Sequence, residues 1–283
     1  MGRSFIGFAI VVVVALASVG GAATRAAHVS VERAVYSPAV DGRLHLAVYL
    51  PADYGTSGVR YPVVYFLHGL PAASTAYQGS SFLADALDRT GQRAIIVAPQ
   101  GARDNDSDPE YLDWGPGRNW ETAITRGVVH YVDSHFRTIA SRRGRAVVGL
   151  SAGGYGAVLL ALHHLRSFSV VESWSGYFHP TNPAGTAALD LGSATANARA
   201  SAHSFVSTLR HSFARNPTFF AFYVGRADRR FHDENVRLDR ELDGAGIGHV
   251  FHVYAGGHRQ SVWQAHAAAW LNLAVRHLSP ARS

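Results

Sequence analysis

Short apolar runs alternate with longer amphipathic segments along most of the chain. Residues 29–36 and 44–50 alternate apolar and polar positions around a turn at Pro38 and Asp41-Gly42, which predicts an antiparallel strand pair. More continuously apolar runs predict six further strands at 62–67, 94–98, 145–148, 168–174, 218–224 and 249–254. Helical patterns occur at 81–89, 122–136, 155–165, 230–245 and 260–277. This order predicts an α/β fold with a mostly parallel central sheet, helices on both faces and an antiparallel N-terminal strand pair.

Two long segments fall outside this pattern. Residues 101–119 and 177–216 follow predicted strands, where such excursions commonly build pocket walls and lids. Within the first, 104–108 (DNDSD) resembles the start of a calcium loop but lacks the glycine and glutamate at the required spacing. We therefore interpret it as a polar loop.

The N-terminus has the organisation of a secretory signal peptide. Met1-Gly2-Arg3 precedes an uncharged apolar run, 5–19, and small residues at 20–23. Cleavage after Ala23 is expected, with Ala26 as a rival site. An uncleaved membrane anchor is the alternative, although the run is shorter than the roughly 20 residues that span a bilayer. We therefore expect a signal at 1–23, a single domain at 29–279, and a secreted or envelope location.

Composition narrows the chemistry. The chain has no cysteine, which excludes a thiol nucleophile and a thiolate metal site. Its net charge is +6, but the basic run Arg142-Arg143-Gly144-Arg145 suits a solvated turn, so no nucleic-acid partner is expected. The chain has no H-E-x-x-H motif, and no metal or cofactor is predicted.

The strongest chemical motif is Gly149-Leu150-Ser151-Ala152-Gly153. It matches G-x-S-x-G between a predicted strand and a predicted helix, the setting of a nucleophile elbow. Glycines on either side of Ser151 remove side chains that would collide in so sharp a turn. The sequence therefore predicts an exposed serine nucleophile at the sheet edge.

A serine nucleophile needs a base and an acid that orients the base. Asp228 follows strand 218–224, and His258 follows strand 249–254, in the chain order serine, acid, histidine. Asp233 and Glu234 are alternative acids. Backbone N–H groups of Ala152 and of the 68–70 turn, through Leu70 or Gly69, are predicted to form an oxyanion hole. We assign structural or solvated roles to the other histidines considered, His163, His164, His179, His203, His211, His232, His249 and His252.

Together these segments resemble the esterase D-like branch of the α/β-hydrolases, which includes S-formylglutathione hydrolases, polysaccharide esterases and mycolyltransferases. The resemblance rests on YPVVYFLHGL, IIVAPQG, NWETAITRGVVHYVDSHF, VVGLSAGGYGA, GRAD and YAGGH. It implies an α/β-hydrolase fold, a Ser151, Asp228 and His258 triad, and an oxyanion hole at Leu70 and Ala152. Trp120-Glu121-Thr122 is similar to the family's W-E-T entry to a helix, so we expect Glu121 to position that helix without being catalytic.

The resulting hypothesis is an exported serine carboxylesterase that works through an acyl-enzyme. Its substrate would be a small-molecule, lipid or carbohydrate ester, with membrane or envelope association through the N-terminus as an option. Residues 153–156 look more like the simple esterases, which favours hydrolysis. Acyl transfer to a carbohydrate or lipid hydroxyl is the alternative, and a catalytically inactive binding protein is a third. Acyl transfer requires an apolar groove. The candidate lining residues are Phe205, Val206, Leu209 and Phe213, which could instead form the packed face of a helix.

Overall fold

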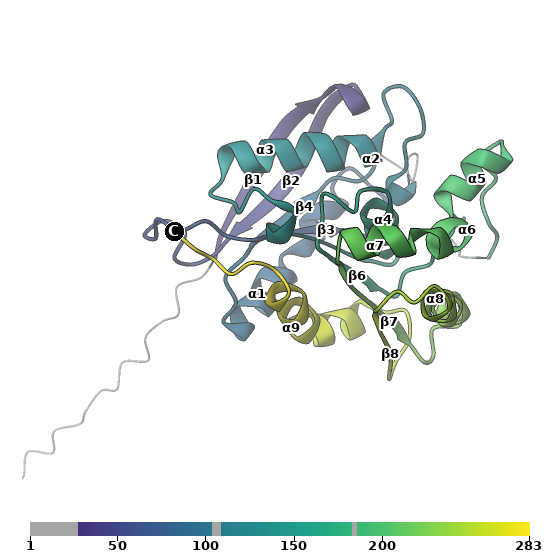
Figure 1. Ribbon diagram of the computed structural model, residues 1–283. Helices are drawn as coiled ribbons and strands as arrows, with labels where there is room; N and C mark the ends of the chain where they lie inside the picture. Colours follow the sequence, from purple (N-terminus) through teal and green to yellow (C-terminus); the bar gives the residue numbers. More distant parts are fainter. Residues whose placement is uncertain (1–27, 104–108, 183–185) are drawn as a thin grey trace, which may run out of the picture.

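The computed structural model describes residues 28–103, 109–182 and 186–283, and these form an eight-stranded sheet between two layers of helices (Figure 1). The strand order is β1-β2-β4-β3-β5-β6-β7-β8. β1 pairs antiparallel with β2, β2 pairs antiparallel with β4, and the remaining pairs are parallel. The predicted sheet is therefore confirmed. Its strands are β1 Val29–Ser37, β2 Gly42–Leu50, β3 Val63–Leu67, β4 Ile95–Pro99, β5 Arg145–Leu150, β6 Val170–Trp174, β7 Phe219–Gly225 and β8 Val250–Tyr254.

Helices cover both faces of the sheet, as predicted (Figure 1). Alternate residues of a strand face opposite sides. Tyr65 of β3 accordingly joins the core beneath α3, α4 and α8, whereas Phe66 joins the core beneath α1 and α9. The helices are α1 Phe82–Thr90, α2 Trp120–Thr122, α3 Val129–His135, α4 Ala152–His163, α5 Ala194–Ala200, α6 Ala202–Phe205, α7 Arg210–Arg215, α8 His232–Gly244 and α9 Gln260–Arg276.

Two predicted helices begin two or three residues earlier in the structure, and the other three differ from their predicted bounds by at most two residues. The helix expected at 122–136 begins at Trp120 and contains a π-helical stretch, Ala123–Val128, between α2 and α3. The helix expected at 155–165 begins at Ala152, three residues earlier, because Gly153 and Gly154 are helical. Glycine has a low helix propensity, and this concealed the first turn.

The 177–216 excursion carries α5, α6 and α7 and packs on the domain. Val206 and Phe213 are buried in the core cluster that includes Phe220, and Phe205 and Leu209 pack against it. None of these four candidates lines the hollow at Ser151. These four residues therefore belong to a packed helical segment and do not line an acyl groove at Ser151.

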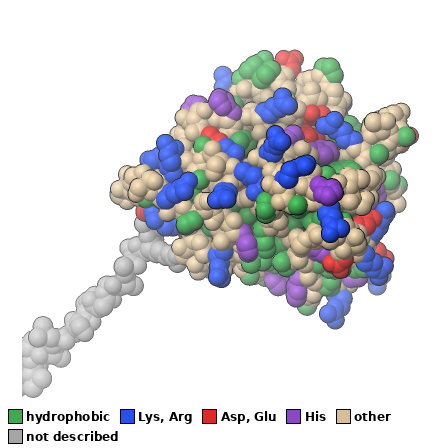
Figure 2. All heavy atoms as spheres, viewed as in Figure 1, with side chains coloured by type: hydrophobic (Ala, Val, Ile, Leu, Met, Phe, Trp, Pro, Cys, Tyr) green, Lys and Arg blue, Asp and Glu red, His purple; other side chains and the backbone are tan. Residues whose placement is uncertain are grey.

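The surface of the protein carries charges of both signs. Figure 2 shows basic side chains spread over the viewed face, with histidine and acidic side chains between them.

Within the described ranges, no helix is both long and apolar enough to cross a membrane. The predicted signal at 1–23 and the polar loop at 104–108 lie outside the described residues.

Candidate active site

Ser151 occupies a sharp turn between β5 and α4. Its φ of 55° and ψ of −121° are strained for a residue with a side chain. A Cβ at Gly149 would lie 2.0 Å from the carbonyl oxygen of Gly153, and a Cβ at Gly153 would lie 1.9 Å from that of Leu67. Both positions therefore require glycine, and the turn presents Ser151 at the carboxyl edge of the sheet.

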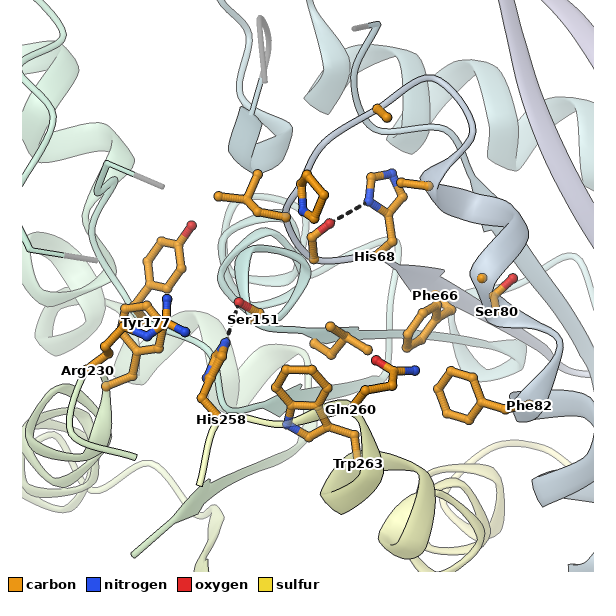
Figure 3. Close-up of a pocket in the computed structure, with 18 of the residues that line it drawn as sticks. Phe66, His68, Ser80, Phe82, Ser151, Tyr177, Arg230, His258, Gln260 and Trp263 are labelled. Atoms are coloured by element: carbon orange, nitrogen blue, oxygen red, sulfur yellow. Dashed lines mark hydrogen bonds between the residues drawn. The ribbon is translucent and has the colours of Figure 1, made fainter. Parts of the chain in front are cut away.

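The structure brings Ser151, His258 and Asp228 into one hydrogen-bonded chain. Nε2 of His258 lies 2.9 Å from Oγ of Ser151 (Figure 3), and Nδ1 of His258 lies 2.8 Å from Oδ2 of Asp228. A carboxylate accepts hydrogen bonds, so Nδ1 carries the hydrogen and Nε2 accepts from the serine hydroxyl. These three residues, spread over about 100 positions of the chain, thus meet in the arrangement that a serine nucleophile needs.

Asp228 is held rigidly for this contact. The residue is 1 % exposed, and its Oδ1 accepts from the backbone N–H groups of Arg230 and Phe231 at 3.2 and 3.3 Å. The alternative acids lie elsewhere: Asp233 contacts His232, and Glu234 accepts from other histidines. The structure therefore places Asp228, and not the alternatives, beside His258.

The turn after β3 passes directly against the elbow. A Cβ at Gly69 would lie 3.0 Å from the Cβ of Ser151. Nε2 of His68 accepts from the N–H of Gly101 at 3.2 Å, so Nδ1 carries the hydrogen and donates to the carbonyl of Gly69 at 2.9 Å. Burial lowers the pKa of His68, which keeps this neutral tautomer. The turn that contains Leu70 is thereby fixed beside Ser151.

The other residue predicted to donate to an oxyanion, Ala152, lies at the start of α4. Ala152 is the first residue of that helix, so its N–H has no intrahelical acceptor. Aligned peptide dipoles also make the helix N-terminus electropositive. Ala152 follows Ser151 directly, and Leu70 lines the same hollow as Ser151, so both predicted donors lie near the serine.

Aromatic rings surround His258, and no sequence motif pointed to them. The ring of Trp263 on α9 packs edge-on against the imidazole of His258, with ring centroids 4.8 Å apart. The ring of Phe231 packs against it in the same way, with centroids 5.1 Å apart. Nε1 of Trp263 donates to Oγ of Ser175 at 3.0 Å, and that oxygen lies 2.5 Å from the hydroxyl of Tyr254. Ser175 has a φ of 53° at the end of β6. These buried contacts connect β6, β8 and α9 behind the imidazole.

The hollow above Ser151 has a volume of about 680 Å³ (Figure 3). Phe66, Phe82 and Trp263 lie on one side of the serine, with the polar side chains of Ser80 and Gln260 among them. Tyr177 and Arg230 lie on the other side. The hollow can therefore hold an ester whose two groups extend to either side of Ser151.

A buried acid supports Tyr177 in the wall of this hollow. The hydroxyl of Tyr177 donates to Oε1 of Glu110 at 2.6 Å, and the N–H of Thr181 donates to the same oxygen at 3.1 Å. Burial raises the pKa of Glu110 to about 7, against the lowering effect of these hydrogen bonds. Glu110 lies in the 101–119 excursion, where no periodic pattern drew attention to it.

Glu121 has a structural setting, as the W-E-T resemblance implied. Its Oε1 accepts from Nδ1 of His163 at 3.0 Å and from Nε2 of His164 at 2.8 Å. Burial alone would raise the pKa of Glu121, but these hydrogen bonds outweigh it and hold the pKa at about 2. The residue joins α2 to the end of α4.

Comparisons with known proteins show the family of the chain. A family model described as "Putative esterase" matches residues 37–271. Esterase Rv1288 of Mycobacterium tuberculosis is 33% identical over 239 residues, which cover 75% of this chain and 51% of the relative. The diacylglycerol acyltransferase/mycolyltransferase Ag85A of Mycobacterium leprae is 29% identical over 152 residues, covering 50% of this chain and 44% of that protein. The chain spans about half the length of these curated relatives.

Solved structures show the same fold. A ferulic acid esterase superposes with a TM-score of 0.75 at 22% identity, covering 90% of this chain and 100% of that one. An S-formylglutathione hydrolase from Agrobacterium tumefaciens superposes with a TM-score of 0.73 at 20% identity, covering 90% and 98%. These likenesses establish the α/β-hydrolase fold.

Proposed function

The chain belongs to this esterase family, and we propose that it is a serine carboxylesterase with Ser151 as nucleophile, His258 as base and Asp228 as the acid that orients His258. The observation that carries the proposal is the continuous hydrogen-bonded chain from Asp228 Oδ2 through the imidazole to Ser151 Oγ, at 2.8 and 2.9 Å. A serine hydroxyl is a weak nucleophile by itself, and this contact supplies the base that activates it.

In the first half of the reaction, Oγ of Ser151 attacks the ester carbonyl carbon while Nε2 of His258 takes the hydroxyl proton. Asp228 stays ionised and stabilises the imidazolium. The N–H groups of Ala152 and Leu70 would donate to the oxyanion, and removal of one such donor typically costs about 3 kcal/mol of transition-state stabilisation. The imidazolium then gives its proton to the leaving alkoxide oxygen, and an alcohol departs.

The second half begins with the acyl group bound as an ester to Oγ of Ser151. A water molecule loses a proton to Nε2 of His258 as its oxygen attacks the acyl carbon. The tetrahedral intermediate collapses, the proton returns to Oγ of Ser151, and the carboxylic acid is released. The free enzyme is thereby restored, and water is the only reactant besides the ester.

Acyl transfer is the second candidate because the matched relatives include proteins named as mycolyltransferases. A sugar or lipid hydroxyl would attack the same acyl-enzyme in place of water. The more extensive match to esterase Rv1288, over 75% of this chain, favours hydrolysis. We further propose that residues 29–279 form one catalytic domain and that residues 1–23 direct export, which the intact mass of protein recovered from the medium would test.

The test is mass spectrometry after exposure of the full chain to a fluorophosphonate. We expect one adduct on Ser151, absent from Ser151→Ala and retained in Ser80→Ala, which removes another serine that lines the hollow. Release of a p-nitrophenyl ester's acyl group to water, compared with its transfer to added sugar or glycerol, then separates hydrolysis from transfer. A folded wild-type protein without an adduct would overturn both and leave the inactive binding protein.

A further inference from the structure

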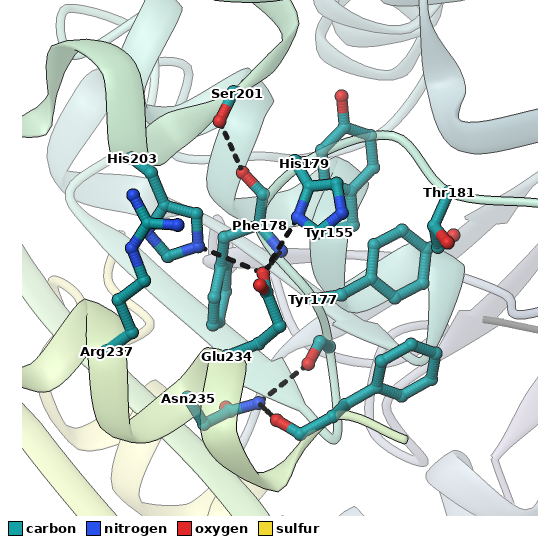
Figure 4. Close-up of polar contacts among 12 residues, drawn as sticks. Tyr155, Tyr177, Phe178, His179, Thr181, Ser201, His203, Glu234, Asn235 and Arg237 are labelled. Atoms are coloured by element: carbon teal, nitrogen blue, oxygen red, sulfur yellow. Dashed lines mark hydrogen bonds and ion pairs between the residues drawn. The ribbon is translucent and has the colours of Figure 1, made fainter. Parts of the chain in front are cut away.

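A second polar cluster lies between the 177–216 excursion and α8. Nδ1 of His179 lies 3.0 Å from Oε2 of Glu234, and Nε2 of His203 lies 2.9 Å from the same oxygen (Figure 4). Nδ1 of His203 lies 2.6 Å from Oε2 of Glu241. Within the described part of the chain, His179, His203 and Glu234 are the one group of three metal-ligating residues whose ligand atoms lie within 4.8 Å of one another.

The buried His203 lies between two carboxylates. Its side chain is 3% exposed, and its two ring nitrogens face oxygens of Glu234 and Glu241. The ligand atoms of His179, His203 and Glu234 all lie within 4.8 Å of one another. The space between these three atoms is therefore small enough for a single cation to contact all of them.

We propose that His179, His203 and Glu234 form a binding site for one Zn²⁺ ion. Imidazole nitrogen and carboxylate oxygen are ligands that zinc prefers, and three protein ligands with a fourth open position is an established zinc arrangement. His203 would bind through Nε2 and His179 through Nδ1 after their hydrogens leave, while Glu234 supplies an oxygen.

Glu241 strengthens the assignment. Metal-bound histidines usually donate their second ring nitrogen to a carboxylate or carbonyl, which fixes the ring and raises its basicity. Glu241 accepts from the Nδ1 hydrogen of His203 in this way, on the side away from Glu234. Arg237 contacts the other oxygen of Glu241 at 2.9 Å and partly offsets the negative charge. The carboxylate is thereby oriented toward His203.

The site is open to solvent on one side. His179 and Glu234 line a hollow of about 370 Å³ that shares Tyr177 and Arg230 with the hollow above Ser151. The side chain of His179 is 31% exposed, so an ion and a water ligand can reach it. Because the ligands come from the excursion and from α8, bound zinc would fasten the excursion to the helix that follows Asp228. Zinc binding at this site would not depend on the proposed esterase activity.

The test is a zinc titration of the tag-free full chain after dialysis against a chelator. Calorimetry should show one Zn²⁺ per chain, and the thermal midpoint should rise with zinc concentration. His179→Gln keeps an amide that can donate to Glu234 but weakens zinc binding by about 100-fold or more, and Glu241→Gln weakens it by about 10- to 100-fold. The matched control is His164→Gln, which alters a histidine of similar exposure, 27%, that is bonded to Glu121.

Circular dichroism on each variant shows whether it is folded before its zinc affinity is compared. The proposal is supported when wild type and His164→Gln bind zinc equally and the other two variants bind it more weakly. It is overturned when the wild type shows no saturable binding, when His179→Gln binds as tightly as wild type, or when His164→Gln loses the ion.

Discussion

Glu172 should make the stability of this protein depend strongly on pH. The residue lies on β6 with no exposed surface, and its two oxygens meet Nε1 of Trp174 at 3.1 Å and the hydroxyl of Tyr223 at 3.3 Å. Burial raises its pKa from the ordinary value of 4.5 to about 8, despite these two hydrogen bonds. Glu172 is therefore a neutral acid at pH 7 in the folded protein.

The size of this pH effect follows from the difference between the pKa of Glu172 in the folded and unfolded states. A carboxyl whose pKa is raised on folding contributes its full stabilisation below about pH 4.5, and this contribution is lost as pH rises toward 8. Each pH unit within this window lowers the unfolding free energy by about 1.4 kcal/mol, or about 5 kcal/mol in all. The change matters for the site because the carbonyl of Trp174 accepts from the N–H of Ser151 at 2.9 Å.

Glu172→Gln isolates this effect. The glutamine carbonyl can accept from Nε1 of Trp174, and its amide can donate to the oxygen of Tyr223 once the Tyr223 hydroxyl, which donates to Glu172, rotates its hydrogen away. In urea denaturation between pH 5.5 and 7.5, the free energy of unfolding of the variant should rise relative to wild type by about 2 to 3 kcal/mol. Glu110 titrates in both proteins and cancels in the difference. A difference that stays constant across this range would refute the reasoning.

Two further predictions concern the site. Asp228→Asn should leave the fold intact and lower ester turnover by about 10⁴-fold, because the amide no longer selects the tautomer of His258; near-normal steady-state rates would remove Asp228 from the mechanism. Gly153→Ala should lower the urea-derived stability by about 3 kcal/mol or more, since its Cβ would lie 1.9 Å from the carbonyl oxygen of Leu67. Gly55→Ala, where nothing lies within 4 Å, is the control, and equal effects of the two would contradict the packing argument.

Local patterns predicted the strands well because burial on both faces leaves a continuous apolar run. The β5 strand and the sharp turn at Ser151 could be predicted from one short segment, since steric limits around Gly149 and Gly153 act between near neighbours. The positions of Asp228 and His258 after β7 and β8 also followed from chain order. Their catalytic roles remain proposals that the labelling and Asp228→Asn experiments test.

Other features depend on contacts between distant segments. The sequence favoured Asp228 as the acid, with Asp233 and Glu234 as alternatives, and only the packing of the 228–231 turn placed Asp228 beside His258. The π-helical stretch inside the predicted 122–136 helix and the packed helices of the 177–216 excursion were likewise beyond periodicity. Tertiary packing, rather than local helix propensity, determines the conformations of these segments.

The sequence by itself therefore determined the alternation of strands and helices, the strained serine turn and the order of its partners, because each is encoded in residues close along the chain. The tertiary structure alone decided which acid reaches His258, which rings surround the imidazole, and that two histidines of the excursion meet two glutamates of α8. These contacts depend on the distances and burial that arise when remote segments pack, and no local pattern records them.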